Sequence, residues 1–192
     1  MYDQLHKELL KQEVLHADET TLQVPHEPGK TARSNSYMWL YRTSGDINRP
    51  IVLFDYQPGR GACYPKAFLN GFKGYLHTDG YDVYYKLPEI TVVGCCAHAR
   101  KKFDEAMKSL PKGKAKGSSA AQGLAYCNLL LKVEEGSVDL SPQKRYDQRL
   151  KQAKPVLDAP LAWANTRVAA PKSSLDKALS YLKEQRTYLL NY

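Results

Sequence analysis

The chain has 192 residues and a hydrophobic content of 43%, which is typical of a globular protein with one core and a small second lobe. No apolar run approaches the roughly 18 residues of a bilayer span, residues 1–13 are too polar for a signal peptide, and the four cysteines lack paired spacing. These features exclude a membrane protein and predict a reduced, cytoplasmic one. Residues 1–99 carry 10 Lys and Arg against 11 Asp and Glu, whereas residues 100–192 carry 18 against 9. The basic half favours an anionic partner, nucleic acid first, over a surface that is basic only for solubility.

The first half predicts three consecutive strands, then alternating helices and strands. Residues 14–24 alternate in polarity, as in a strand with one buried face. Pro65 is placed as in the first turn of a helix. The order β-β-β-α-β-β-α predicts an α/β fold with a ribonuclease-H-like core over residues 1–110. The predicted helices cover residues 2–12, 64–72 and 97–110, and the predicted strands cover residues 14–24, 37–41, 51–56, 74–79 and 91–95.

The second half predicts helices only. Residues 111–121 (PKGKAKGSSAA) have the composition of a flexible basic linker, and residues 122–192 are predicted to form an all-helical region. Pro155 and Pro160 are expected to interrupt the chain after a helix that ends near residue 153. The last helix has the clearest pattern, with Ser173 and Asp176 as start signals and an apolar stripe of Leu175, Leu179, Leu182 and Leu189.

Two stretches nearly repeat each other, LHAD at residues 15–18 and LHTD at residues 76–79. In a ribonuclease-H-like order the first and fourth strands are neighbours, so Asp18 and Asp79 can share one face of the sheet. Two close carboxylates repel each other unless a cation lies between them. Mg²⁺ prefers oxygen ligands, and a pair of such ions stabilises the attacking and leaving oxygens of a phosphodiester displacement. Asp18 and Asp79 are therefore predicted to be catalytic ligands of Mg²⁺ or Mn²⁺.

Two other interpretations of the aspartates are open. In the first, both residues cap turns. This is the usual role of Asp before Gly, as in Asp79-Gly80, but it is less common inside a strand, where Asp18 lies. A His-x-Asp motif with His98 as a second imidazole is also typical of a non-haem iron oxygenase, although such enzymes usually have a closed all-β barrel.

The stretch GCCAHARKK at residues 94–102 carries a third group of candidates. Cys96 and His98 have the residue types of zinc ligands, but no second ligand pair has the spacing of a zinc finger. A structural zinc site is therefore not expected, and the alternative is a strand-to-helix junction with a buried cysteine and a solvated basic face. Arg100, Lys101 and Lys102 are predicted to contact DNA phosphates.

Several segments have a combined pattern that is highly specific. They are VLHADET (14–20), FDY (54–56), GYLHTDGYDVY (74–84) and VGCCAHARKKF (93–103), followed by SPQKRYDQR, KPVLDAPLAW and PKSSLDKALSYL in the helical region. Together they resemble the insertion-sequence-66 family of DDE transposases. The resemblance implies that Asp18 and Asp79 are the first two acids of the DDE triad. It also places Cys96 and His98 in a Cys-x-His-x-Arg signature of unassigned chemical role.

The resemblance further implies DNA transposition by a divalent metal, with double-stranded DNA at the element ends and the target as partner, and a homo-oligomer in the full-length protein. The family's third acid lies in an Asn-Asn-x-x-Glu-Arg segment that these 192 residues lack, and its usual upstream DNA-binding parts are missing too. Asp176 and Glu184, the acids of the last helix, match no such motif and are interpreted as a helix cap and a solvated residue. We therefore expect a core fragment, of a longer protein or a decayed gene, that neither nicks nor joins DNA alone. The alternative function is a non-catalytic DNA-binding remnant.

Overall fold

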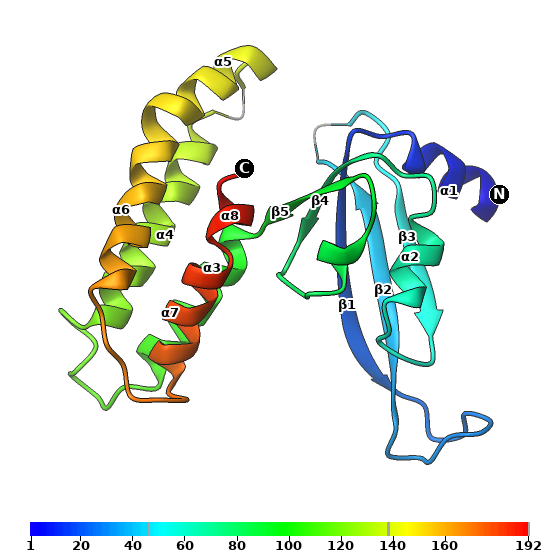
Figure 1. Cartoon of the computed structure of the whole chain (residues 1–192), viewed down its shortest axis with the longest axis horizontal. Coiled ribbons are helices and arrows are strands. Elements are labelled where there is room, and N and C mark those ends of the chain that lie inside the picture. Colours follow the sequence, from blue (N-terminus) through cyan, green and yellow to red (C-terminus); the bar gives the residue numbers. More distant parts are fainter. Residues whose placement is uncertain (46, 138, 192) are drawn as a thin grey trace. The chain divides into compact units, whose positions relative to one another are not determined.

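The computed structural model describes residues 1–45, 47–137 and 139–191, and it has a mixed α/β fold (Figure 1). The chain divides into two compact units. Residues 1–94 form an α/β unit and residues 95–190 form a helical unit. Within the described ranges, no helix is long and apolar enough to cross a membrane.

A five-stranded sheet in the order β3-β2-β1-β4-β5 forms the centre of the α/β unit (Figure 1). The first three strands are antiparallel neighbours, whereas β4 joins β1 in parallel and β5 joins β4 in parallel. The elements of this unit are α1 (Tyr2–Leu10), β1 (Val14–Gln23), β2 (Asn35–Thr43), β3 (Val52–Gln57), α2 (Cys63–Phe68), β4 (Gly74–Thr78), the short 3₁₀ helix η1 (Tyr84–Lys86) and β5 (Ile90–Gly94). The strands and the helices α1 and α2 lie within a few residues of the predicted ones, whereas the sequence predicts no element at η1.

Alternation along the strands decides which side chains the α/β unit buries. In β1, Leu15 and Ala17 are buried, whereas Asp18 lies on the opposite, exposed side. Tyr41 of β2 pairs in register with Ala17, and its ring stacks on Phe68 of α2 with the ring centroids 3.8 Å apart. Helix α2 therefore packs on the face of the sheet that Leu15 and Ala17 occupy.

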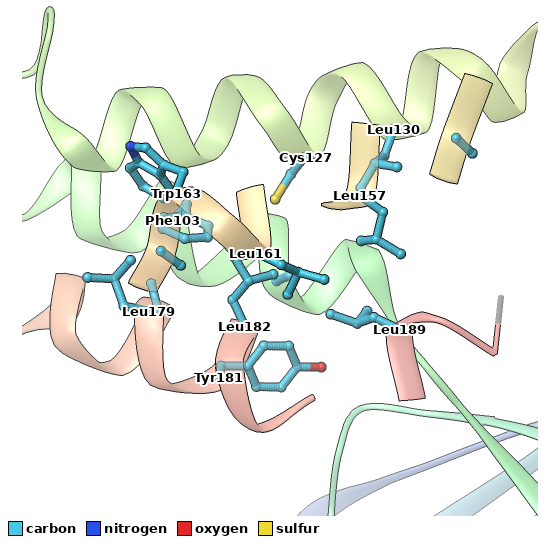
Figure 2. Close-up of a cluster of buried hydrophobic side chains, with 14 residues drawn as sticks. Phe103, Cys127, Leu130, Leu157, Leu161, Trp163, Leu179, Tyr181, Leu182 and Leu189 are labelled. Atoms are coloured by element: carbon cyan, nitrogen blue, oxygen red, sulfur yellow. The ribbon is translucent and has the colours of Figure 1, made fainter. Parts of the chain in front are cut away.

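The helical unit is built around one cluster of apolar side chains, shown in Figure 2. Its elements are α3 (Cys96–Lys108), α4 (Ser119–Glu135), α5 (Pro142–Gln148), the π-helical segment η2 (Arg149–Ala153), α6 (Lys154–Asn165), α7 (Ser174–Glu184) and α8 (Arg186–Leu189). Side chains from several of these helices meet in the cluster, among them Phe103, Cys127, Leu130, Leu157, Leu161, Trp163, Leu179 and Leu182.

The boundary between the units lies before α3, whereas the sequence pattern placed a boundary near residue 110. The reason is the packing of Phe103, which is fully buried and lies 6.1 Å from the ring of Trp163. The apolar face of helix α3 therefore packs against the other helices of the helical unit. Helix α4 begins inside the segment predicted to be a linker, where Ser118 caps it by accepting the N–H of Ala121 at 3.1 Å.

The prediction that Pro155 and Pro160 interrupt the chain is wrong, because α6 runs through both. Pro155 lies in the first turn of α6, which continues directly from η2. Its ring would clash with the carbonyl of Lys151 in a regular α-helix, and the residues just before it form the wider π turn of η2 instead. Pro160 is buried, so its packing offsets the lost backbone hydrogen bond.

The predicted start of the last helix is confirmed. The Ser173 hydroxyl accepts the N–H of Asp176 at 3.1 Å, and the Asp176 carboxylate accepts the N–H of Lys172 at 2.8 Å. Glu184 is exposed near the end of α7. Both acids therefore have the local roles that the sequence predicts.

Candidate functional site

Asp18 and Asp79 are brought together by two strands that are far apart in the sequence. Asp18 lies within β1 and Asp79 directly follows β4, and these strands are adjacent and parallel. Their register pairs His16 with His77, and continuing it by two residues sets Asp18 beside Asp79. Neighbouring strands lie about 4.8 Å apart, so the two backbones are close at His16 and His77, two residues before the aspartates. The predicted pairing of the first and fourth strands is confirmed.

Each of the two carboxylates accepts a backbone hydrogen bond. Asp18 Oδ1 accepts the N–H of Glu19 at 2.8 Å, and Asp79 Oδ1 accepts the N–H of Tyr81 at 3.0 Å. The second bond closes a turn at Gly80, whose φ of +100° favours glycine. Asp79 therefore does cap a turn, as the alternative interpretation holds. A carboxylate has two oxygens, so turn capping and metal binding are compatible in one residue.

The histidines of the two repeats also lie side by side. The rings of His16 and His77 stack with their centroids 4.9 Å apart and an interplanar angle of 28°. Both side chains are half-buried. The predicted proximity of the two histidines is confirmed, and it shows that the strands are aligned up to the positions just before the aspartates.

The carboxylate of Glu19 is buried near the two aspartates. The sequence does not predict Glu19 as a site residue. Alternation turns Glu19 toward the covered face of the sheet, and its side chain is only 1% exposed. Burial raises the pKa of Glu19, and the negative charge of Asp79 raises it further. Hydrogen bonds from Arg60 and Tyr84 lower the pKa of Glu19 and so offset part of this increase. Tyr84 Oη donates to Glu19 Oε2 at 2.9 Å, and Arg60 Nε donates to Oε1 at 2.9 Å. A Glu at a core position of the β1 alternation was the sequence signal for this site.

Arg60 connects Glu19 to the turn that carries Asp79. Its guanidinium lies 3.8 Å from the centre of the Tyr81 ring, and the Tyr81 hydroxyl donates to the Arg60 carbonyl at 2.6 Å. The backbone of Tyr81 in turn bonds to Asp79. A continuous series of contacts thus runs from Glu19 through Arg60 and Tyr81 to Asp79.

The donor set of the pair suits one hard divalent ion. Mg²⁺ usually binds proteins through one or two carboxylates and keeps several waters, so Asp18 and Asp79 fit that ion or Mn²⁺. Among the residues that the structure describes, no group of three or more His, Cys, Asp and Glu side chains is placed to hold a metal ion. The pair therefore does not supply the ligands that a second ion needs.

The predicted phosphate contacts lie on α3 in the helical unit and differ in their surroundings. Arg100 Nε donates to Asn128 Oδ1 of α4 at 2.6 Å, and Lys102 Nζ lies 5.0 Å from the centre of the Tyr181 ring. Lys101 is exposed. Arg100 and Lys102 thus support the packing of α3, and a role of the three residues in DNA binding stays a prediction.

Cys96 and His98 occupy the first turn of α3. Cys96 packs against the apolar cluster of the helical unit, and burial raises the pKa of its thiol to about 12. All four cysteines are free thiols in the structure. These surroundings are those of a strand-to-helix junction, and among the described residues no group of three or more His, Cys, Asp and Glu side chains is placed to hold a metal ion here.

Comparison with protein families assigns the whole chain. The family model described as "Transposase IS66 family" matches residues 1–192. The chain belongs to the IS66 transposase family. The resemblance seen in the sequence segments is thereby confirmed.

Two curated relatives of this IS66-family chain occur in Sinorhizobium fredii, and both are described as uncharacterized proteins. The protein y4qI is 35% identical over 105 residues, which cover 47% of this chain and 19% of y4qI. The protein y4hP is 26% identical over 178 residues, which cover 85% of this chain and 32% of y4hP. The chain thus spans about a third of the length of y4hP and about a fifth of the length of y4qI. No solved structure matches it.

Proposed function

We propose that this IS66-family chain forms part of the catalytic core of a DDE transposase, in which Asp18 and Asp79 hold a divalent metal ion for DNA strand cleavage and joining. The observation that supports this proposal is the parallel β1–β4 register, which pairs His16 with His77 two residues before the two aspartates. The strand order β3-β2-β1-β4-β5 supports a ribonuclease-H-like core. The family description supports transposition as the process.

The chemistry proposed for the pair is metal-assisted phosphoryl transfer. A bound Mg²⁺ or Mn²⁺ supplies positive charge where an attacking and a leaving phosphate oxygen develop negative charge. Asp18 within β1 and Asp79 directly after β4 would hold that ion, and each carboxylate accepts one backbone hydrogen bond. The iron-oxygenase interpretation is not favoured, because the chain belongs to a transposase family.

The charge distribution supports double-stranded DNA, at element ends and target, as the partner. Residues 100–192 carry 18 Lys and Arg against 9 Asp and Glu, and the exposed Lys101 belongs to that half. Phosphate contacts of this kind position DNA without reading its sequence. We further propose that the full-length protein acts as a homo-oligomer.

We also propose that the third acid of the triad lies outside residues 1–192. Glu19 is turned to the covered face in an ion pair with Arg60, Asp176 caps α7, and Glu184 is exposed on α7. None of these fits the motif of the third acid. A two-metal reaction needs enough carboxylate to hold both ions, so this chain alone is expected to neither nick nor join DNA.

A strand-transfer assay with labelled element ends in Mn²⁺ tests the proposal. It compares the 192-residue chain with a longer chain that includes the Asn-Asn-x-x-Glu-Arg segment. The longer chain is expected to join DNA, and Asp18→Asn or Asp79→Asn is expected to abolish joining. Asp82→Asn, an exposed aspartate close to the site, serves as the matched control.

Two outcomes would change this account. DNA binding without joining by the longer chain would favour a non-catalytic DNA-binding remnant. Robust joining by the 192-residue chain, lost in Asp79→Asn, would mean that another residue, Glu184 first, supplies the third ligand.

A further inference from the structure

A buried ion pair joins three segments around the two aspartates. Glu19 of β1 is bonded by Arg60, from the loop between β3 and α2, and by Tyr84 of η1. The Glu19 side chain is 1% exposed and the Arg60 side chain 41% exposed, so the pair lies at the edge of the core. Burying a carboxylate is costly unless it is paired and hydrogen-bonded, so Glu19 requires both partners in place.

The ion pair extends to Asp79 through Tyr81. Arg60 covers one face of the Tyr81 ring at 3.8 Å, and its carbonyl accepts the Tyr81 hydroxyl at 2.6 Å, so both the ring and the hydroxyl of Tyr81 are held. The N–H of Tyr81 then donates to Asp79 Oδ1 at 3.0 Å. The ring of Tyr84 meets that of Tyr81 edge to face, with the ring centroids 6.2 Å apart.

Gly80 makes this external support important. It lies between Asp79 and Tyr81 with a φ of +100°, and glycine has more backbone freedom than any other residue. The contacts of Tyr81 with Arg60 therefore add a restraint to a turn whose glycine restricts the backbone little. On the other strand, Glu19 directly follows Asp18 and donates its N–H to Asp18 Oδ1 at 2.8 Å. A single ion pair thus anchors both aspartates.

We infer that Glu19, Arg60 and Tyr81 form a positioning clamp that holds the carboxylates of Asp18 and Asp79 in the geometry that binds the metal ion. This inference rests on the proposed metal-binding function of the two aspartates. None of the three clamp residues is a ligand in this proposal, because Glu19 faces the side of the sheet opposite to Asp18, Arg60 is a cation, and the Tyr81 hydroxyl is bonded to the Arg60 carbonyl. Residues that orient metal ligands in this way typically change metal affinity by 10- to 100-fold.

Mn²⁺ binding to the 192-residue chain, measured from the electron paramagnetic resonance signal of free Mn²⁺, tests the clamp. Arg60→Ala is expected to weaken Mn²⁺ affinity about tenfold. Arg60→Lys keeps the charge beside Glu19 but loses the flat contact with Tyr81, so a smaller loss is expected. Tyr81→Phe, which removes only the hydroxyl bond to the Arg60 carbonyl, is expected to show a measurable but still smaller loss.

Controls separate positioning from folding. Arg49→Ala, an exposed arginine in the loop between β2 and β3, is expected to leave Mn²⁺ affinity unchanged. Thermal unfolding of each variant shows whether it is folded. Arg60→Lys and Tyr81→Phe are expected to unfold near the wild-type temperature, and they carry the test if Arg60→Ala does not fold.

The possible failures are distinguishable. Wild-type Mn²⁺ affinity in folded Arg60→Lys and Tyr81→Phe, with loss of binding in Asp79→Asn, would overturn the clamp alone. Equal Mn²⁺ binding by the wild type and Asp79→Asn would instead overturn the metal site on which the clamp rests.

Discussion

At the scale of single residues, position in a strand separates the carboxylates of this region. Asp18 and Glu19 are neighbours in β1, yet alternation turns one toward solvent and the other into the core. Asp79 lies past the end of β4, where Gly80 turns the chain. The exposed Asp18 and the half-buried Asp79 are thus candidate ligands of a metal ion, whereas the buried Glu19 forms an ion pair with Arg60.

The buried thiol of Cys127 predicts a pH-dependent contribution to stability. Cys127 is 4% exposed, and burial raises its pKa to about 11, against a smaller opposite effect of Arg100. The unfolded thiol has a pKa of about 8.5, so this contribution is complete below that pH and is lost as the pH rises toward the folded value. Between pH 7 and pH 10 we expect Cys127→Ala to lose about 2 kcal/mol less unfolding free energy than the wild type. Denaturant unfolding at both pH values measures the difference, and equal losses would contradict the prediction.

At the scale of helices and strands, the sequence predicts elements well where a local pattern decides them. The alternation of β1 and the Ser173 cap of α7 depend on residues within a few positions of each other, and both are found as predicted. The sequence does not predict helix α6, because its two prolines are a strong local signal against a helix. Its burial, and the π turn before it, are properties of the folded helical unit.

The candidate site was predictable only in part, for a similar reason. Asp18 and Asp79 stand in repeated motifs, so their pairing follows once β1 and β4 are placed side by side. The partners of Glu19 come from Arg60 and Tyr84, which lie in a loop and a short helix with no periodic pattern. Contacts between irregular segments leave no local signal in a single sequence.

Packing between α3 and α4 predicts a specific steric effect. A Cβ added at Gly123 of α4 would lie 2.4 Å from the buried ring of Phe103. Gly123→Ala is therefore expected to lower the free energy of unfolding by about 1–3 kcal/mol, because the core must shift to admit the methyl group. Gly136→Ala is the matched control, since Gly136 has helical dihedral angles and its nearest neighbour would be 3.6 Å from the new Cβ. Denaturant unfolding that shows equal stability for both variants would contradict this packing.

At the scale of the whole molecule, charge and candidate chemistry lie in different parts of the chain. The aspartate pair belongs to the α/β unit, whereas residues 100–192 carry nine more basic than acidic residues. Under the proposed function, the helical unit would contact DNA phosphates and the α/β unit would carry the metal-binding aspartates.

DNA binding is expected to be largely independent of sequence and to weaken steeply with salt, because cations leave the DNA on association. Replacing Arg100, Lys101 and Lys102 together with Ala should flatten the slope of log affinity against log salt. Lys101→Ala alone should account for about one unit of that change, since only Lys101 is exposed. Lys66→Ala, an exposed lysine of α2, is the control. An unchanged slope in the triple variant would show that these residues are ordinary surface.

The central claim is that Asp18 and Asp79 hold one divalent ion together, and a double-mutant cycle on Mn²⁺ affinity tests it most directly. If the ion is shared, Asp18→Asn and Asp79→Asn should each remove nearly as much affinity as the double variant, because either loss breaks the same site. Binding by the wild type is expected to be weak, since Mg²⁺-like ions dehydrate reluctantly and only two protein ligands are present. Asp82→Asn should leave the affinity unchanged. Losses that add independently in the double variant, or Mn²⁺ binding that neither single variant weakens, would contradict a shared ion.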